Sequence, residues 1–154
     1  MATWSHFTHA DPELAAFGRE RLSGGVAYLA TTRADGGPRV HPVTPIIGGE
    51  RLYIYMEPTS PKGHDLRRDG RFALHSAVEN ADGGGGEFLI HGRAEPITDP
   101  DIRAACDALA PYEPRDRYIL FELHLGRVLA TVYEGGETVR RRWRAESVNA
   151  DDAG

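Results

Sequence analysis

Lysine is almost absent from this 154-residue chain. Of its 18 basic residues, only Lys62 is a lysine, and all the others are arginines. Such a bias fits a GC-rich genome and needs no functional cause. Even so, a chain that otherwise never uses lysine places its single one beside Ser60, Pro61 and Gly63. That segment is therefore the first candidate for a specific role.

Cysteine and long apolar runs are scarce as well. Cys106 is the one cysteine, so no disulfide can form within the chain, which agrees with a reducing compartment. No apolar run approaches the roughly 20 residues that a membrane helix needs, and the first residues lack a secretory pattern. We therefore expect a cytoplasmic protein that does not engage a membrane. The net charge of −5 disfavours nucleic acid as a partner.

The remaining composition is ordinary for a globular protein. Hydrophobic residues make up 40% and charged residues 27% of the chain, and the length is enough for one domain with a hydrophobic core. No linker divides the chain and nothing repeats at a fixed period. We expect a single domain over residues 1–145, and a disordered tail over residues 146–154.

Short strands alternate with glycine-rich turns. Asp11 and Pro12 are typical of a helix start, and Gly24 ends that helix. Further helices are expected over 58–70 and 100–109, and strands over 26–32, 39–47, 51–57, 71–78, 87–97, 117–133 and 138–144. Tight turns join the first three strands, which predicts a meander, and the residues before Asp11 are expected to be mobile. About seven strands and two or three short helices indicate a mainly β barrel or sandwich.

The segment from Met56 to His64 has the parts of a phosphate site. It leads from a strand end through a polar turn into a helix start, where free N–H groups and the helix dipole favour an anion. Ser60 adds a hydroxyl and Lys62 a positive charge, and both suit a phosphate dianion. The same Ser-Pro-Lys sequence also fits a plain capped turn.

One hairpin earlier, Arg39 and His41 lie two residues apart on a predicted strand, so both project to one face. Pro42 cannot donate a hydrogen bond to a neighbouring strand, which predicts a bulge or a free edge there. A flat ligand could bind to backbone groups at such a break. The alternative is an arginine and a histidine that simply face solvent.

Taken in order, these segments resemble the pyridoxamine 5'-phosphate oxidase-like, FMN-binding split-barrel family. The similarity runs from Gly25 to about Arg144. It rests on the segments Leu-Ala-Thr-Thr at 29–32, Pro-Arg-Val-His-Pro-Val at 38–43, Leu-Tyr-Ile-Tyr at 52–55, Ser-Pro-Lys at 60–62, Arg-Phe-Ala-Leu at 71–74 and Gly-Arg-Ala at 92–94.

The resemblance implies a six- to seven-stranded antiparallel split β-barrel of Greek-key type and an FMN-dependent oxidoreductase. It also implies a homodimer in which partner residues complete each cofactor site. The strand over 39–43 would line the flavin and the turn near Lys62 would bind the phosphate, while Arg142 and Trp143 match a region that reaches toward the flavin. The implied cofactor-binding residues are Arg39, Val40, His41, Pro42, Val43, Tyr55, Met56, Ser60, Lys62 and Gly63.

Other functions of the same fold stay open. The chain ends without the Arg-x-His element that the family's namesake uses for its substrate phosphate, so the small-molecule substrate is not indicated. Because arginine is abundant, the deazaflavin coenzyme F-420, with its long acidic tail, is an alternative cofactor. A third alternative is a non-enzymatic protein that binds flavin or heme.

The remaining candidate residues point to structural roles. The histidines at 41, 64, 75, 91 and 124 lack the local spacing of a zinc site. Cys106 falls on the apolar face of its predicted helix, so we expect a buried thiol that is not catalytic. No nucleophile motif is present, so we expect neither a metal nor a catalytic side chain.

Overall fold

The computed structural model describes residues 1–146. A disordered tail was expected over residues 146–154, and residues 147–154 of it lie outside the described residues. Four helices and eight strands occur in the order α1 (Trp4–Ala10), α2 (Pro12–Leu22), β1 (Ala27–Thr32), β2 (Pro38–Val43), β3 (Ile46–Gly48), β4 (Arg51–Met56), α3 (Pro61–Arg68), β5 (Arg71–Ser76), β6 (Glu87–Pro96), α4 (Pro100–Leu109), β7 (Ile119–Glu134) and β8 (Glu137–Arg144).

All strands belong to one antiparallel sheet that is not closed into a full barrel. The strand order is β2-β1-β5-β6-β7-β4-β3, and β8 pairs with β7 beside this path. The 16-residue β7 pairs with β6 over residues 121–131, with β4 over residues 119–122 and with β8 over residues 127–134. This arrangement is mainly β and agrees with the split-barrel fold, which is confirmed.

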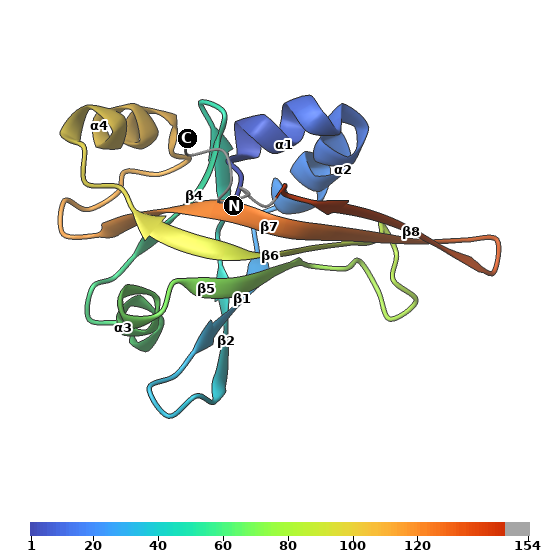
Figure 1. The fold of residues 1–154 in the computed structure, drawn as a ribbon, viewed down its shortest axis with the longest axis horizontal. Helices are drawn as coiled ribbons and strands as arrows, with labels where there is room; N and C mark the ends of the chain where they lie inside the picture. The colour runs from blue at the N-terminus through green and yellow to red at the C-terminus, as the bar shows by residue number, and fades with distance from the viewer. Residues whose placement is uncertain (147–154) are drawn as a thin grey trace, which may run out of the picture.

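Helices cover the sheet on two sides. In Figure 1, α1 and α2 lie above β7 and β8, whereas α3 lies below, beside β1 and β2. The main core holds Trp4 and Phe7 of α1, which pack edge-on or tilted against Phe88 of β6. A smaller apolar cluster, with Tyr53 and Cys106, lies between α4 and the strands β3, β4 and β7. Both faces of β4 are therefore covered.

Most local predictions are confirmed. Asp11 caps α2 by accepting a hydrogen bond from the Leu14 amide, and Ser60 caps α3 in the same way through Gly63. Cys106 is buried on α4, as its position in the apolar pattern predicts. The segment predicted as one or two strands over 117–133 forms the single strand β7, Ile119–Glu134. Its pairing with β6 shifts register between His91 and Gly92, where Gly126 of β7 has no partner.

Three expectations are wrong. The first residues are not mobile: Thr3 caps α1, whose Trp4 and Phe7 are among the most buried side chains. Residues 39–47 form two strands, β2 and β3, and the predicted meander does not exist, because β2 pairs with β1 and β3 pairs with β4. The sheet has eight strands rather than six or seven, since this extra break divides one predicted strand.

The contact between α2 and β6 leaves no room for a side chain at Gly18. A methyl group there would lie 2.4–2.8 Å from ring atoms of Phe88, whose ring is held in place by Trp4, Phe7 and Phe17. We predict that Gly18→Ala lowers the free energy of unfolding by about 1–3 kcal/mol through overpacking. Urea denaturation measures this loss.

Gly24→Ala is the matched control. Gly24 has no heavy atom within 4 Å of the added methyl group and its φ is outside the left-handed region. A Gly-to-Ala change in such a place reduces the freedom of the unfolded chain and costs nothing in packing. Equal destabilisation by both variants would contradict the packing argument.

Candidate functional site: the cleft at the split of the sheet

The sheet is split where β2 and β4 come near each other without pairing. Strand β2 is one edge of the sheet and pairs only with β1, whereas β4 lies near the other edge, between β3 and β7. A cleft of about 360 Å³ opens at this split, within the roughly 300–1,000 Å³ usual for small-molecule sites. We call it the tyrosine cleft; it is lined by Val26, Pro42, Val43, Thr44, Tyr55, Met56, Glu57, Lys62, Tyr112 and Tyr118.

Lys62 contributes the positive charge of this cleft. It is the second residue of α3 and is half-buried. Within residues 1–146 its ammonium group has no hydrogen-bond or ion-pair partner. Glu57, the one acidic side chain of the lining, forms an ion pair of 2.9 Å with Arg117. The Arg117 hydrogen bond holds the pKa of that carboxyl below its usual range.

The turn that carries Lys62 is fixed by Ser60 and Gly63. The Ser60 hydroxyl accepts a hydrogen bond from the Gly63 amide at 3.1 Å and donates one to the Glu57 carbonyl at 2.7 Å. A Cβ at position 63 would lie 2.8 Å from that same carbonyl oxygen, so glycine is needed for close packing. The hydroxyl of Ser60 therefore serves the turn, as a plain cap does.

A buried carboxylate holds α3 against β1 and β2. Asp65, 2% exposed, accepts hydrogen bonds from Thr31 and from Arg39 at 2.7 Å each and from Arg68 at 3.0 Å. Burial alone would raise the pKa of Asp65, but these three donors lower it below its ordinary value. This network fixes the position of Lys62 relative to β2.

Tyrosines form the wall opposite β2. Tyr55 stacks edge-on with Tyr112, lies under the guanidinium of Arg103, and donates a 2.6 Å hydrogen bond to Asp107 on α4. Burial first, and then this bond to Asp107, raises the pKa of Tyr55. Its hydroxyl stays protonated at neutral pH and is already engaged.

The ten predicted site residues divide into two sets. Pro42, Val43, Tyr55, Met56 and Lys62 line the tyrosine cleft, although the Met56 side chain is 1% exposed and belongs mainly to the core. The others lie outside its lining. Ser60 and Gly63 form the turn behind it, and Arg39 binds Asp65. His41 is half-buried on one face of β2, whereas Val40 is exposed on the other face of that strand.

Tyr112 and Tyr118 were not predicted from the sequence. Both come from the segment between α4 and β7, 50 and 56 residues after Lys62 along the chain. Their only signal is a pair of aromatic residues in a polar, proline-containing connection. Nothing local shows that this connection returns to the turn before α3.

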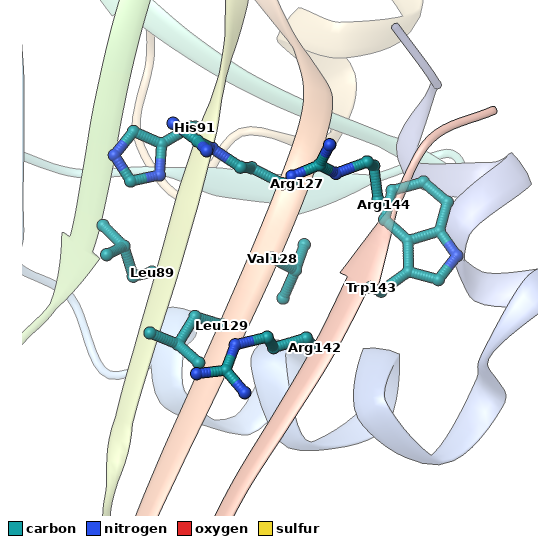
Figure 2. A pocket seen from close by; sticks show the side chains of 8 residues that line it. All are labelled: Leu89, His91, Arg127, Val128, Leu129, Arg142, Trp143 and Arg144. Atoms are coloured by element: carbon teal, nitrogen blue, oxygen red, sulfur yellow. The ribbon is translucent and has the colours of Figure 1, made fainter. Parts of the chain in front are cut away.

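A second hollow, of about 480 Å³, lies on β6, β7 and β8. Figure 2 shows Leu89 and His91 on β6, Arg127 and Leu129 on β7, and Arg142 and Arg144 on β8 around it. We call it the β6–β8 hollow. Burial, with the nearby charge of Arg127, lowers the pKa of His91. The ring of Trp143 lies 4.9 Å from that of Phe7, so it packs toward α1.

The described residues contain neither a metal-binding cluster nor a membrane-spanning helix. No group of three or more His, Cys, Asp or Glu side chains that could hold a metal ion is found within residues 1–146. In the same described part of the chain, no helix has the length and apolar character to cross a membrane.

Comparison with known proteins decides the family. The sequence model of pyridoxamine 5'-phosphate oxidase matches residues 11–131, which include β1 to β6 and most of β7. The chain belongs to this family. The sequence matches no curated protein.

Solved structures show which relatives share the fold of this pyridoxamine 5'-phosphate oxidase family member. A heme binding protein from Mycobacterium smegmatis is 20% identical, with a TM-score of 0.66 over 84% of this chain, which spans 58% of that protein. A NimC/NimA family protein from Clostridium acetobutylicum is 19% identical, with a TM-score of 0.59. The match covers 80% of this chain and 91% of the Clostridium protein. The heme storage protein HutZ from Vibrio cholerae is 15% identical, with a TM-score of 0.56. The match covers 75% of this chain and 89% of HutZ.

The Asp65 network yields a prediction about pH. Asp65→Ala should lower the free energy of unfolding by about 2–3 kcal/mol at pH 7. This loss is toward the lower end of what breaking a buried ion pair costs, because Arg39 and Arg68 remain partly exposed to water. Since the folded pKa of Asp65 is depressed, its contribution is present above about pH 4, the unfolded value, and is lost as the pH falls through the folded value.

Urea denaturation of both proteins at pH 7 and at pH 3 measures the difference. The gap between wild type and variant should shrink at the lower pH. Asp82→Ala is the control, because Asp82 is exposed and its side chain accepts no hydrogen bond among the described residues. A gap that stays constant with pH would remove Asp65 as the cause.

Proposed function

We propose that this chain binds FMN in the tyrosine cleft and acts as a dimeric oxidoreductase that transfers a hydride to or from a small molecule. One observation carries the proposal. The chain's only lysine lies, without a protein partner in residues 1–146, at a cleft whose other walls are mainly apolar and aromatic. A phosphate attached to a flat ring system has this chemical character.

The residues of the cleft fit such a group. The Lys62 ammonium would pair with the phosphate, whereas the Gly63 and His64 amides of the α3 N-terminus already donate to Ser60. Pro42 and Val43 on one side, and Tyr112 and Tyr118 on the other, would flank the ring. Glu57 opposes an anion only weakly because Arg117 already neutralises it. Arg39 binds Asp65 through Nε, and its terminal nitrogens donate no hydrogen bond among the described residues.

FMN, when bound, supplies the hydride chemistry itself, so the protein's part is to bind, orient and shield it. Neither Tyr55, committed to Asp107, nor Ser60, committed to its turn, is free to exchange a proton with a substrate. The tyrosine wall would exclude water from the ring.

Dimerisation is supported by an uncovered apolar face of the sheet. Tyr28 on β1 and Val40 on β2 are 47% and 61% exposed and lie on the same face as the β6–β8 hollow, with its Leu89 and Leu129. Exposed apolar side chains grouped on one face of a sheet are candidates for an interaction site. A second copy would cover it and bring the arginines of β8 toward the cofactor of its partner.

Heme binding without catalysis is the second candidate. The β6–β8 hollow combines an apolar floor, a histidine whose pKa is lowered, and the arginines 127, 142 and 144. A neutral imidazole can ligate iron, and guanidinium groups pair with carboxylates. Two structural relatives are named for heme.

Cofactor titration separates these functions. The purified protein is titrated with FMN, FAD, coenzyme F-420 and hemin, followed by absorbance and by quenching of flavin or tryptophan fluorescence. Tightest binding of FMN, followed by reduction with NAD(P)H and reoxidation by an acceptor, would support the proposal. A Soret band without flavin binding would assign the heme function instead.

Lys62→Ala should weaken FMN binding about tenfold or more, because a charge-assisted contact is worth about 1.5–3 kcal/mol. Fluorescence titration measures the dissociation constant. Lys62→Arg is the matched control, since it keeps the charge and should bind more tightly than the alanine variant. Unchanged affinity in Lys62→Ala would remove this residue from the site.

The dimer is tested at Val40. Light scattering should give twice the 16.9 kDa of one chain for the wild type, and Val40→Glu should shift the mass toward the monomer because a charge cannot be buried there without cost. Val139→Glu, on the similarly exposed Val139 of β8, should leave the dimer intact. A monomeric wild type would count against the proposal.

A further inference from the structure

A third cleft, of about 570 Å³, lies at the C-terminal end of α3, away from Lys62 at the other end of this eight-residue helix. Its walls come from the β1–β2 turn, the start of β5 and the end of β6. We call it the arginine cleft. Five arginines line it, against the single acidic residue Asp69, and they are Arg33, Arg67, Arg68, Arg71 and Arg93.

Two of these arginines stabilise the end of α3. Arg68 donates to the Thr32 carbonyl and to Asp65, and Arg67 donates to the carbonyls of Pro58 and Gly63. These bonds hold the end of α3. They explain two of the five guanidinium groups, so the charge of the cleft is not simply a by-product of helix capping.

The other three share a single acidic side chain of the cleft, Asp69. Arg71 and Arg93 lie directly opposite each other on β5 and β6, a position in which like charges destabilise a sheet. Asp69 binds Arg71 at 2.6 Å, and Arg93 has no partner within residues 1–146. The pKa of Asp69 lies at about 2, chiefly because Arg71 hydrogen-bonds to it. Arg33 reaches only its exposed neighbour Asp35, at 3.8 Å.

The composition of the cleft indicates its ligand. Guanidinium groups match phosphate oxygens in planar, paired hydrogen bonds. The lining contains no aromatic side chain on which a ring could stack, and the cleft is larger than a single phosphate needs. We propose that the arginine cleft binds a short phosphate chain, a diphosphate or triphosphate, held mainly by Arg93, Arg71 and Arg33.

The test is calorimetric titration with inorganic triphosphate, inorganic diphosphate, ADP and orthophosphate at low salt. We expect one site per chain, with triphosphate and ADP bound at least about tenfold more tightly than orthophosphate and all binding weakened by salt. Tighter binding of ADP than of inorganic diphosphate would identify a nucleotide as the source, and equal binding an inorganic chain. Absence of binding, or equal affinity for orthophosphate, would overturn the proposal.

Variants locate the site. Arg93→Gln, and independently Arg33→Gln on the exposed turn, should each weaken triphosphate binding about tenfold, the loss of one charge-assisted contact. Arg19→Gln, an exposed arginine of α2 without an ion pair in the described residues, is the matched control and should bind as wild type does. Circular dichroism checks that each variant is folded.

Lys62→Ala keeps this test independent of the proposed function. The arginine cleft does not include Lys62, so that variant should lose FMN affinity and retain triphosphate binding. Loss of triphosphate binding in Lys62→Ala, with retention in both glutamine variants, would place the phosphate chain in the tyrosine cleft and overturn the inference.

Discussion

The carboxylate of Asp65 receives hydrogen bonds from its own helix and from two strands whose donors lie 34 and 26 residues earlier in the sequence. Thr31 reaches it from β1, Arg39 from β2 and Arg68 from its own helix. A buried charge is tolerated only when it is paired and hydrogen-bonded, so these groups must assemble together. Their assembly fixes the position of α3 against β1 and β2, and hence the place of Lys62 at the tyrosine cleft.

The tyrosine cleft exists because the sheet does not close. Pro42 has no N–H to offer a further strand, and β2 is accordingly an edge. The chain then crosses at Thr44 and Pro45 to the other edge of the sheet. Two unpaired regions are thus held near each other by covalent connection and not by pairing, which leaves space for a ligand between them. The proposed function depends on that gap.

The sequence predicted what is decided locally. Caps at Asp11 and Ser60 and the alternation of residues 52–56 depend on neighbours in the chain, and these elements are confirmed. Strand pairing depends on the whole sheet, so the meander was wrong. The same holds for the cleft: no local pattern shows that Arg39 faces an aspartate of α3, or that Tyr112 returns to Tyr55. The short helix at Trp4 was missed because its stability comes from burial in the core.

The scarcity of lysine has a chemical consequence for this molecule. Apart from the α-amino group of Met1, the chain carries a single primary amine, and that amine lies in the tyrosine cleft. Aldehydes, active esters and other amine-directed reagents would therefore attach a dye, crosslinker or affinity label to a defined wall of the candidate site. The composition bias makes the proposed cofactor pocket selectively addressable without any engineered residue.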